Sequence, residues 1–198
     1  MCSEGISNNI CLPDNYSKFD LPKPDGLNLV YISIDIEDVL EINDKDYSIT
    51  FATFLNVEWL ERRLHVDPDF MSLHSNDKVL VTMDLEFLKD LWLPNLFIYN
   101  LKTFTEISVL SNLAGLWIDP NKNVLHSLAT HISFICPMSF DKFPLDEQRC
   151  LFRVGSYSYD NSKMMFFTKS FGYSSKKSNT FALDYAISKY SKYISLKM

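Results

Sequence analysis

Two of the four cysteines, Cys136 and Cys150, enclose a loop of thirteen residues and could form a disulfide bond. Closing a loop of this size would remove unfolded-state entropy worth roughly 3 kcal/mol. Disulfides persist in oxidising compartments, so such a bond would place the chain on a secretory route. No signal peptide is visible, because the N-terminus lacks a charged head and an apolar stretch. We therefore expect either a piece of a secreted or membrane protein or a pair of reduced thiols, and we favour the first.

Aromatic side chains are the other residues that could carry chemistry. Phe54, Phe97, Tyr157 and Tyr159 come from four separate expected strands or strand ends. The faces of aromatic rings attract cations, and clustered rings are what a site for a cationic ligand requires. A single aromatic residue is more often part of a core, so both interpretations stay open at this point.

Metal and enzyme chemistry have little support in the sequence. The four histidines form no pair spaced four residues apart as in a zinc-binding helix, and no Cys-x-x-Cys is present. These histidines are His65, His74, His126 and His131. A glycine-rich phosphate loop and a Gly-x-Ser-x-Gly elbow are also missing from the sequence. We expect no metal site, no cofactor and no enzymatic activity.

The pattern of apolar residues predicts strands. Alternate residues from Val30 to Ile36 are apolar, which indicates a half-buried strand. Residues 43–46 predict a turn, and the following run, residues 47–59, places Phe54 on its polar face. Short strands separated by turns about every 8 to 12 residues predict an all-β fold, an immunoglobulin-like antiparallel β-sandwich. Further strands are expected at 79–83, 105–110, 116–118, 124–135, 151–159 and 163–168, with a bend at Pro94.

The length of 198 residues suits one domain. We expect an extended lead-in over residues 1–29 and the sandwich over residues 30–198. A net charge of -6 argues against nucleic acid as a partner. In the lead-in, Cys2 and Cys11 could pair or remain unpaired, and Asn15 begins an Asn-x-Ser sequon that is a candidate glycosylation site.

The residues between the central cysteines follow the pattern Cys-Pro-Met-x-Phe-x-x-Phe-Pro-Leu-Asp-x-Gln-x-Cys. This pattern resembles the signature loop of the Cys-loop pentameric ligand-gated ion channels, in the form seen in the anion channels gated by glycine, γ-aminobutyrate or glutamate. The resemblance runs from about Val30 to about Ile187. Four further motifs follow the family's order: Trp59-x-Glu61-x-Arg63-Leu64, Trp92-x-Pro94-Asn95, Val124-Leu125-His126-Ser127 and Ser156-Tyr157-Ser158-Tyr159.

The resemblance implies an extracellular ligand-binding domain that assembles as a homo- or hetero-pentamer of related subunits. A small ligand would be held between neighbouring subunits. The principal face would use the first and second binding loops, and the complementary face would use strands of the neighbour. The implied contacts are Phe97, Tyr157 and Tyr159 on the first face, and Phe54, Asn56 and Ser127 on the second.

Three departures from the family pattern bear on the ligand. Receptors for amino-acid transmitters commonly hold the ligand carboxylate with arginine, whose guanidinium binds carboxylates in a bidentate manner. The corresponding positions here are Asn56 and Ala129, and the position that often carries an acid for the ligand amine is Gly155. We therefore do not expect an amino-acid transmitter, and consider an accessory subunit or gating by an amine, protons or a metal ion.

The resemblance also implies a route from the ligand to a pore. The loop closed by Cys136 and Cys150 would relay ligand binding together with the turn at residues 43–46. Its coupling residues would be Phe140, Phe143, Pro144 and Asp146. We expect a location at the extracellular side of the plasma membrane, with membrane contact only through segments absent from this chain.

Because the sequence stops soon after Ile187, we expect the tip loop, the final strand and the transmembrane helices to be lacking. The alternative is a soluble ligand-binding or decoy protein of the same fold.

Overall fold

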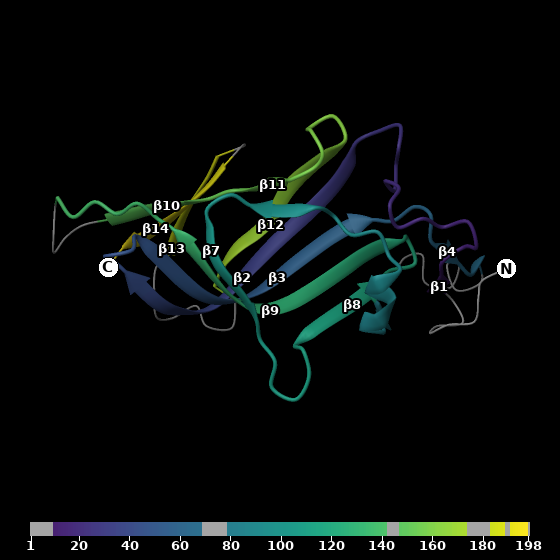
Figure 1. The fold of residues 1–198 in the computed structure, drawn as a ribbon, viewed down its shortest axis with the longest axis horizontal. Coiled ribbons are helices and arrows are strands. Elements are labelled where there is room, and N and C mark those ends of the chain that lie inside the picture. Colours follow the sequence, from purple (N-terminus) through teal and green to yellow (C-terminus); the bar gives the residue numbers. More distant parts are fainter. Residues whose placement is uncertain (1–9, 69–78, 142–146, 174–182, 189–190, 198) are drawn as a thin grey trace.

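The computed structural model describes residues 10–68, 79–141, 147–173, 183–188 and 191–197 (Figure 1). These residues form strands joined by turns, together with a short 3-10 helix, η1 (Leu85–Lys89). The predicted all-β fold is confirmed. A seven-stranded sheet has the order β12-β2-β3-β9-β8-β5, and β7 pairs with the part of β9 that β8 leaves free. Its strands are β12 (Met164–Tyr173), β2 (Asn28–Asn43), β3 (Ser48–Leu60), β9 (Asn123–Ile135), β8 (Ala114–Ile118), β5 (Val81–Met83) and β7 (Leu101–Glu106).

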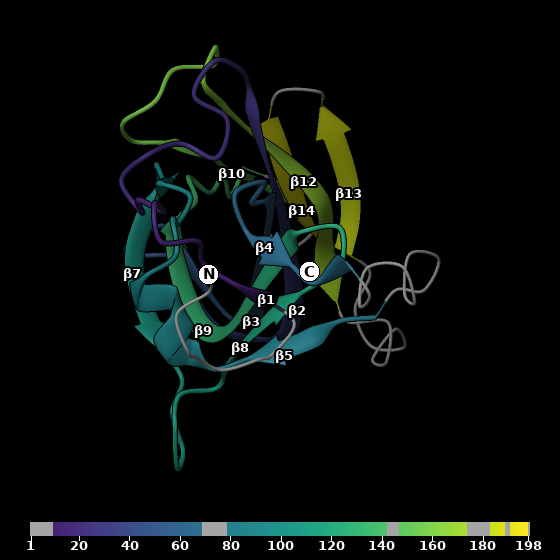
Figure 2. The ribbon, with the colours of Figure 1, turned by 90° about the vertical axis from the view of Figure 1, so that its right-hand side faces the viewer.

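A second layer covers the inner face of the large sheet. Its strands β10 and β11 follow one another in the chain, with Arg153 between them. They pair with different partners, because β11 pairs with β6 and β10 pairs with β14. Strand β14 also pairs with β13. In the view along the long axis, the large sheet curves from β8 and β9 at the bottom to β12 on the right, where β13 and β14 also lie (Figure 2). The bounds are β6 (Leu96–Ile98), β10 (Glu147–Phe152), β11 (Val154–Ser156), β13 (Leu183–Ser188) and β14 (Ser191–Lys197).

The hairpin of β2 and β3 is the centre of the large sheet. Its turn spans residues 44–47, one position beyond the predicted turn. Tyr47, predicted to open the next strand, instead completes the turn with φ of 50°, a left-handed conformation that is unusual for a residue with a bulky side chain. Two register shifts in β2, between Ile36 and Asp38 and between Val39 and Glu41, insert extra residues opposite β3. Alternate residues of both strands still point into the core, as the period-two pattern predicts.

A chain of aromatic rings joins the two layers. Phe134 of β9 lies 5.7 Å from Phe51 of β3 and 5.4 Å from Phe152 of β10, measured between ring centroids. Phe152 in turn lies 5.4 Å from Phe171 of β12. The disulfide bond between Cys136 and Cys150 crosses the same gap, with Cα atoms 4.9 Å apart and both cysteines fully buried. The core is therefore fastened both by packing and by a covalent bond.

Three expectations about the strands need correction. The sandwich is not antiparallel throughout, because β12 pairs with β2 in parallel. The strand expected at 105–110 instead spans Leu101–Glu106, and Leu110 is fully exposed in the following loop. The final strand that we expected to be lacking is present as β14, paired between β10 and β13. The tip between β13 and β14, residues 189–190, lies outside the described residues.

No helix in the described part of the chain is long and apolar enough to cross a lipid bilayer.

The lead-in packs onto the sandwich. Its strand β1 (Ile10–Cys11) pairs with β4 (His65–Val66), and Ile10 is fully buried. Cys11 is disulfide-bonded, so the unpaired alternative for this residue is wrong; Cys2 lies outside the described residues. The folded unit therefore begins well before Val30.

A partly buried ion pair holds the lead-in in place. Arg63 donates from Nε to Oε1 of Glu61 at 2.8 Å and from Nη2 to Oε2 at 2.7 Å, and Glu61 is fully buried. Tyr16 donates its hydroxyl to Oε2 of Glu61 at 3.0 Å and accepts the backbone N–H of Trp92 at 2.7 Å. Burial raises the pKa of the Tyr16 hydroxyl. Arg63 also donates to the carbonyl of Ser17 at 2.7 Å, which ties this network to the chain beyond Tyr16.

We expect His126 to make the stability of the fold depend on pH. It lies on β9 with Nδ1 3.0 Å from the carbonyl oxygen of Gly115, and burial lowers its pKa below the ordinary value. The unfolded chain therefore binds a proton more readily than the folded chain once the pH falls below about 6.5. We expect the free energy of unfolding to decrease as the pH falls from there toward the folded-state pKa.

Urea unfolding of His126→Gln at a series of pH values tests this prediction. The variant should lose less stability than the wild type over the same acid range. The matched control is His65→Gln, which removes an exposed histidine. Equal slopes for His126→Gln and the wild type would show that His126 does not contribute to the pH dependence.

Candidate functional site

Two aromatic residues expected at the principal face lie together. Phe97 of β6 and Tyr157, just after β11, have ring centroids 5.6 Å apart, and the ring of Tyr99 lies 5.1 Å from Phe97 in an edge-to-face arrangement. All three side chains are exposed, by 40% for Phe97, 59% for Tyr99 and 77% for Tyr157. We call Phe97, Tyr99 and Tyr157 the aromatic cluster. Exposed rings in contact offer π-faces to a ligand from solvent.

Polar groups of the adjoining loops position the cluster. Asn95 accepts the backbone N–H of Tyr157 through Oδ1 at 2.9 Å, which ties the second loop to the first. The hydroxyl of Ser156 accepts the backbone N–H of Tyr159 at 3.0 Å. Tyr159 itself is half-buried and packs against the core, so its ring is not part of the aromatic cluster.

Gly155 makes room for Tyr99. A Cβ atom at position 155 would lie 3.0 Å from Cε2 of Tyr99 and 3.1 Å from its hydroxyl oxygen, both closer than ordinary contact. Gly155 also lies directly opposite Phe97 in the pairing of β11 with β6. The Tyr99 ring therefore occupies the space that an acidic side chain at position 155 would use.

The residues expected at the complementary face lie on the large sheet. Phe54 and Asn56 project from the same side of β3, and Asn56 pairs across from Ser127 of β9. Phe54 is 41% exposed. Asn56 donates from Nδ2 to Oδ2 of Asp35 at 2.9 Å, and Asp35 pairs across from Phe54. A carboxylate, and not a guanidinium, therefore lies beside Phe54.

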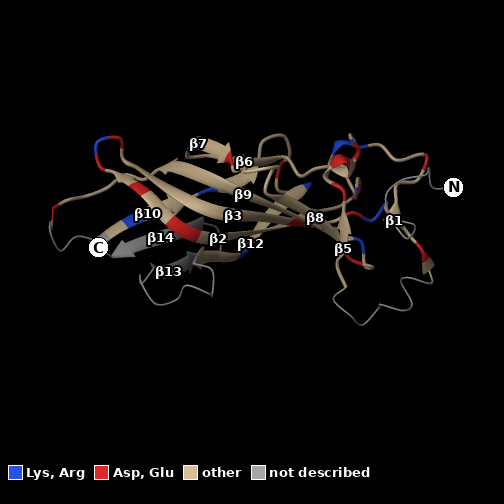
Figure 3. Ribbon diagram, turned by 90° about the horizontal axis from the view of Figure 1, so that it is seen from below, with Lys and Arg blue, Asp and Glu red and all other residues tan. Residues whose placement is uncertain are grey.

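The charge around this second group is negative. Ala129 lies opposite Phe54 and is buried, so neither position 56 nor position 129 supplies a positive charge. Beyond Asp35, β2 carries three more carboxylates, at Glu37, Asp38 and Glu41. Figure 3 shows acidic segments along this part of β2. The field on this face therefore favours a cation over a ligand carboxylate.

The two groups come from different layers of one chain. The aromatic cluster is on β6 and the segment after β11, whereas Phe54, Asn56 and Ser127 are on β3 and β9. In the described part of the chain, no hydrogen bond or ring contact joins the two groups. Within the described residues, the two groups therefore do not form a single site.

The two elements expected to relay the signal touch each other. Cys136 donates its backbone N–H to the carbonyl oxygen of Tyr47, at the end of the β2–β3 turn, at 2.7 Å. Gln148 braces the loop from its other end, because its side chain bonds both the N–H of Ser139, at 2.8 Å, and the carbonyl of Ser139, at 2.7 Å. Phe140 is 40% exposed. The other expected coupling residues, Phe143, Pro144 and Asp146, lie outside the described residues.

The candidate glycosylation site, Asn15, is exposed. Its neighbour Tyr16 is held in the buried network with Glu61, so the sequon lies on a well-anchored part of the lead-in.

Sequence reasoning missed Tyr99, Asn95 and Asp35 as parts of these groups. Tyr99 could have been found from its spacing, because a residue two positions from Phe97 lies on the same side of an extended chain. Asp35 could not, because its neighbours depend on the register shifts in β2.

Comparison with known proteins identifies the family of this chain. The neurotransmitter-gated ion-channel ligand binding domain matches residues 9–196. The chain is similar to the γ-aminobutyric acid receptor subunit rho-3 of Rattus norvegicus, with 31% identity over 145 residues, 73% of this chain and 28% of the relative. It is also similar to subunit rho-1 of Homo sapiens, with 28% identity over 137 residues, 69% of this chain and 27% of the relative. The match thus spans little more than a quarter of these relatives. From the extent of the domain match, the chain belongs to the family of neurotransmitter-gated ion-channel ligand-binding domains.

Proposed function

We propose that this chain is the extracellular ligand-binding part of a ligand-gated chloride channel subunit that assembles as a ring of five at the plasma membrane. The family membership supports a ligand-binding role, and the relatives named as γ-aminobutyric acid receptor subunits support the anion-channel branch. The separation of the two candidate ligand groups on one chain supports assembly, because each half would be completed by a neighbouring subunit.

The ligand that we propose is a small organic cation without a carboxylate. The observation that carries this choice is the pairing of an exposed aromatic cluster with Asp35 beside Phe54. Aromatic faces and a nearby carboxylate both stabilise a positive charge. A ligand carboxylate would meet Asp35 and no guanidinium at position 56 or 129. γ-Aminobutyrate, which the relatives' names mention, is therefore a poor ligand for a site made by this subunit alone.

A conformational change caused by ligand binding would be transmitted to the membrane side through the contact between the disulfide loop and the β2–β3 turn. The hydrogen bond from Cys136 to Tyr47 supports this route, because a displacement of one element would be felt by the other. Gln148 supports it as well, since its two bonds to Ser139 keep the loop and β10 moving together.

Calorimetric titration with tyramine, an aromatic amine without a carboxylate, tests the proposed ligand class. Tyr157→Ala is expected to weaken tyramine binding about tenfold, because a desolvated cation–π contact is worth up to about 2 kcal/mol. Asp35→Asn keeps a hydrogen-bond acceptor for Asn56 but removes the charge, and should weaken binding by about threefold to tenfold.

Phe19→Ala is the matched control, since Phe19 is an aromatic side chain exposed by 82% outside both groups. It should leave tyramine binding unchanged. Binding of γ-aminobutyrate with the higher affinity, or tyramine binding that is insensitive to Tyr157→Ala and Asp35→Asn, would contradict the proposed ligand class.

A further inference from the structure

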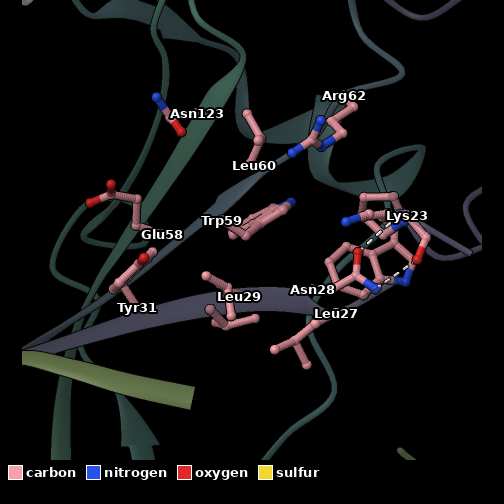
Figure 4. Close-up of a pocket in the computed structure, with 13 residues that line it drawn as sticks. Lys23, Leu27, Asn28, Leu29, Tyr31, Glu58, Trp59, Leu60, Arg62 and Asn123 are labelled. Atoms are coloured by element: carbon pink, nitrogen blue, oxygen red, sulfur yellow. Dashed lines mark hydrogen bonds between the residues drawn. The ribbon is translucent and has the colours of Figure 1, made fainter. Parts of the chain in front are cut away.

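A cavity of about 440 Å³ lies at the end of the large sheet where the lead-in enters β2 (Figure 4). Its wall includes Trp59 and Leu60 of β3, Leu29 of β2 and Lys23 of the lead-in, with Arg62 just beyond β3. No residue of the aromatic cluster lines it, nor do Phe54, Asn56 or Ser127. Its volume is within the range of small-molecule sites, which is roughly 300 to 1,000 Å³. The cavity is therefore separate from the candidate ligand groups.

Two positively charged side chains, those of Lys23 and Arg62, line this cavity. In the described part of the chain, neither the guanidinium of Arg62 nor the ammonium of Lys23 takes part in a hydrogen bond or ion pair. Their backbones are nevertheless held. Asn28 accepts the N–H of Lys23 at 2.9 Å and donates to its carbonyl at 3.0 Å, and Lys122 donates to the carbonyl of Arg62 at 3.3 Å. The backbones of Lys23 and Arg62 are thus held in place, and their charged groups are available to a ligand.

The acidic residue of the wall is already neutralised. Glu58 forms an ion pair with Lys169, whose ammonium also lies 5.1 Å from the ring centroid of Tyr31. In Figure 4, Glu58 and Tyr31 lie on one side of Trp59, and Arg62 and Lys23 lie on the other. The available charge of the cavity is therefore positive and is concentrated at one end.

The wall of the cavity also contains apolar side chains that a ligand can reach. Leu29 is exposed and Leu60 is half-buried, and both line the cavity. Trp59 lines the cavity as well, but it is only 2% exposed and its ring packs into the core. Leu29 and Leu60 would therefore contact the apolar body of a bound molecule.

We propose that this cavity is a second binding site, for a small organic anion with an aromatic or aliphatic body and one carboxylate. The carboxylate would lie between Lys23 and Arg62, where charge-assisted hydrogen bonds are available. The body would lie against Leu29 and Leu60. This site lies within one chain and does not depend on the proposed cation site or on assembly.

Titration with naphthalene-2-carboxylate, followed by the indole N–H resonances in two-dimensional ¹H–¹⁵N NMR spectra, tests the proposal. The three tryptophans give three such signals, and Trp59→Phe assigns the one from the cavity. We expect a saturable shift of the Trp59 signal and little change at Trp117, which lies on β8 and does not line the cavity. Arg62→Gln and Lys23→Gln should each weaken binding by about fivefold.

Lys45→Gln is the matched control, since it removes one positive charge from the exposed β2–β3 turn and should leave binding unchanged. Naphthalene-2-carboxamide, the uncharged analogue, should bind about tenfold more weakly than the carboxylate to the wild type. This comparison needs no variant and remains decisive if a substitution impairs folding. No saturable shift of the Trp59 signal, or equal binding of the two analogues, would overturn the proposal.

Discussion

Replacing Arg63 with methionine is expected to lower the free energy of unfolding by about 3 kcal/mol. Methionine keeps most of the length of the side chain but removes the guanidinium that bonds both oxygens of Glu61. Glu61 is fully buried, so its carboxylate would lose its charge partner in a poorly solvating environment. Tyr16 would also lose the cation that lies 4.3 Å from its ring centroid. Urea unfolding followed by far-UV circular dichroism gives the free energy.

The neighbouring arginine provides the control. Arg62→Met removes the same charge from an exposed side chain with no hydrogen bond or ion pair in the described part of the chain, and should change stability by no more than about 0.5 kcal/mol. The double variant Glu61→Met/Arg63→Met should be more stable than Arg63→Met alone, because it removes the isolated buried charge. A double variant that is less stable than Arg63→Met would show that lost packing, and not the unpaired carboxylate, causes the effect.

Removing the central disulfide has the second large effect. The double variant Cys136→Ala/Cys150→Ala is expected to lose about 3 kcal/mol of stability, the chain-entropy value for a loop of this size. The bond joins the end of β9 to β10, so it crosses between the two layers at the point where Phe134 and Phe152 also meet. Its loss should therefore loosen the contact between the layers as well as the loop.

Thermal unfolding monitored by near-UV circular dichroism would report both consequences. The melting temperature should fall, and hydrogen exchange should become faster in β10 than in the β2–β3 hairpin, which has its own extensive pairing. Ser139→Ala is a suitable control, because it alters the same loop but leaves the disulfide and the backbone bonds from Gln148 in place. A double cysteine variant as stable as the wild type would contradict the predicted contribution.

The strands and the main turn were predictable because their signals are local. The alternation from Val30 to Ile36 reports which side of a strand faces the core, and this depends only on the period of an extended chain. The predicted turn at residues 43–46 contains Asn43, Asp44 and Asp46, whose short polar side chains favour reversal of the chain. The parallel pairing of β12 with β2 was not predictable, since nothing in either strand's own pattern specifies the direction of its partner.

The candidate site was predictable in part. The motif resemblance pointed to Phe97 and Tyr157, and the structure brings their rings into contact. Which residue of β3 lies opposite Asp35 depended on the register along the whole of β2. An uninterrupted hairpin from the pair Asn43 and Ser48 would place Asp35 opposite Asn56, whereas the two register shifts place it opposite Phe54. Each shift adds one residue to β2, and together they move the partner by two positions and keep the same face.

The sequence by itself determined that the chain folds as strands, which faces of β2 and β3 are buried, and which family motifs are present. The tertiary structure alone decided that a carboxylate lies beside Phe54 and that Tyr99 covers Gly155. It also decided that Lys23 and Arg62 line the same cavity. The physical reason is the range of the interactions. Burial pattern and turn formation depend on residues close together in the chain, whereas these three arrangements depend on strand register and on side chains brought together from distant segments.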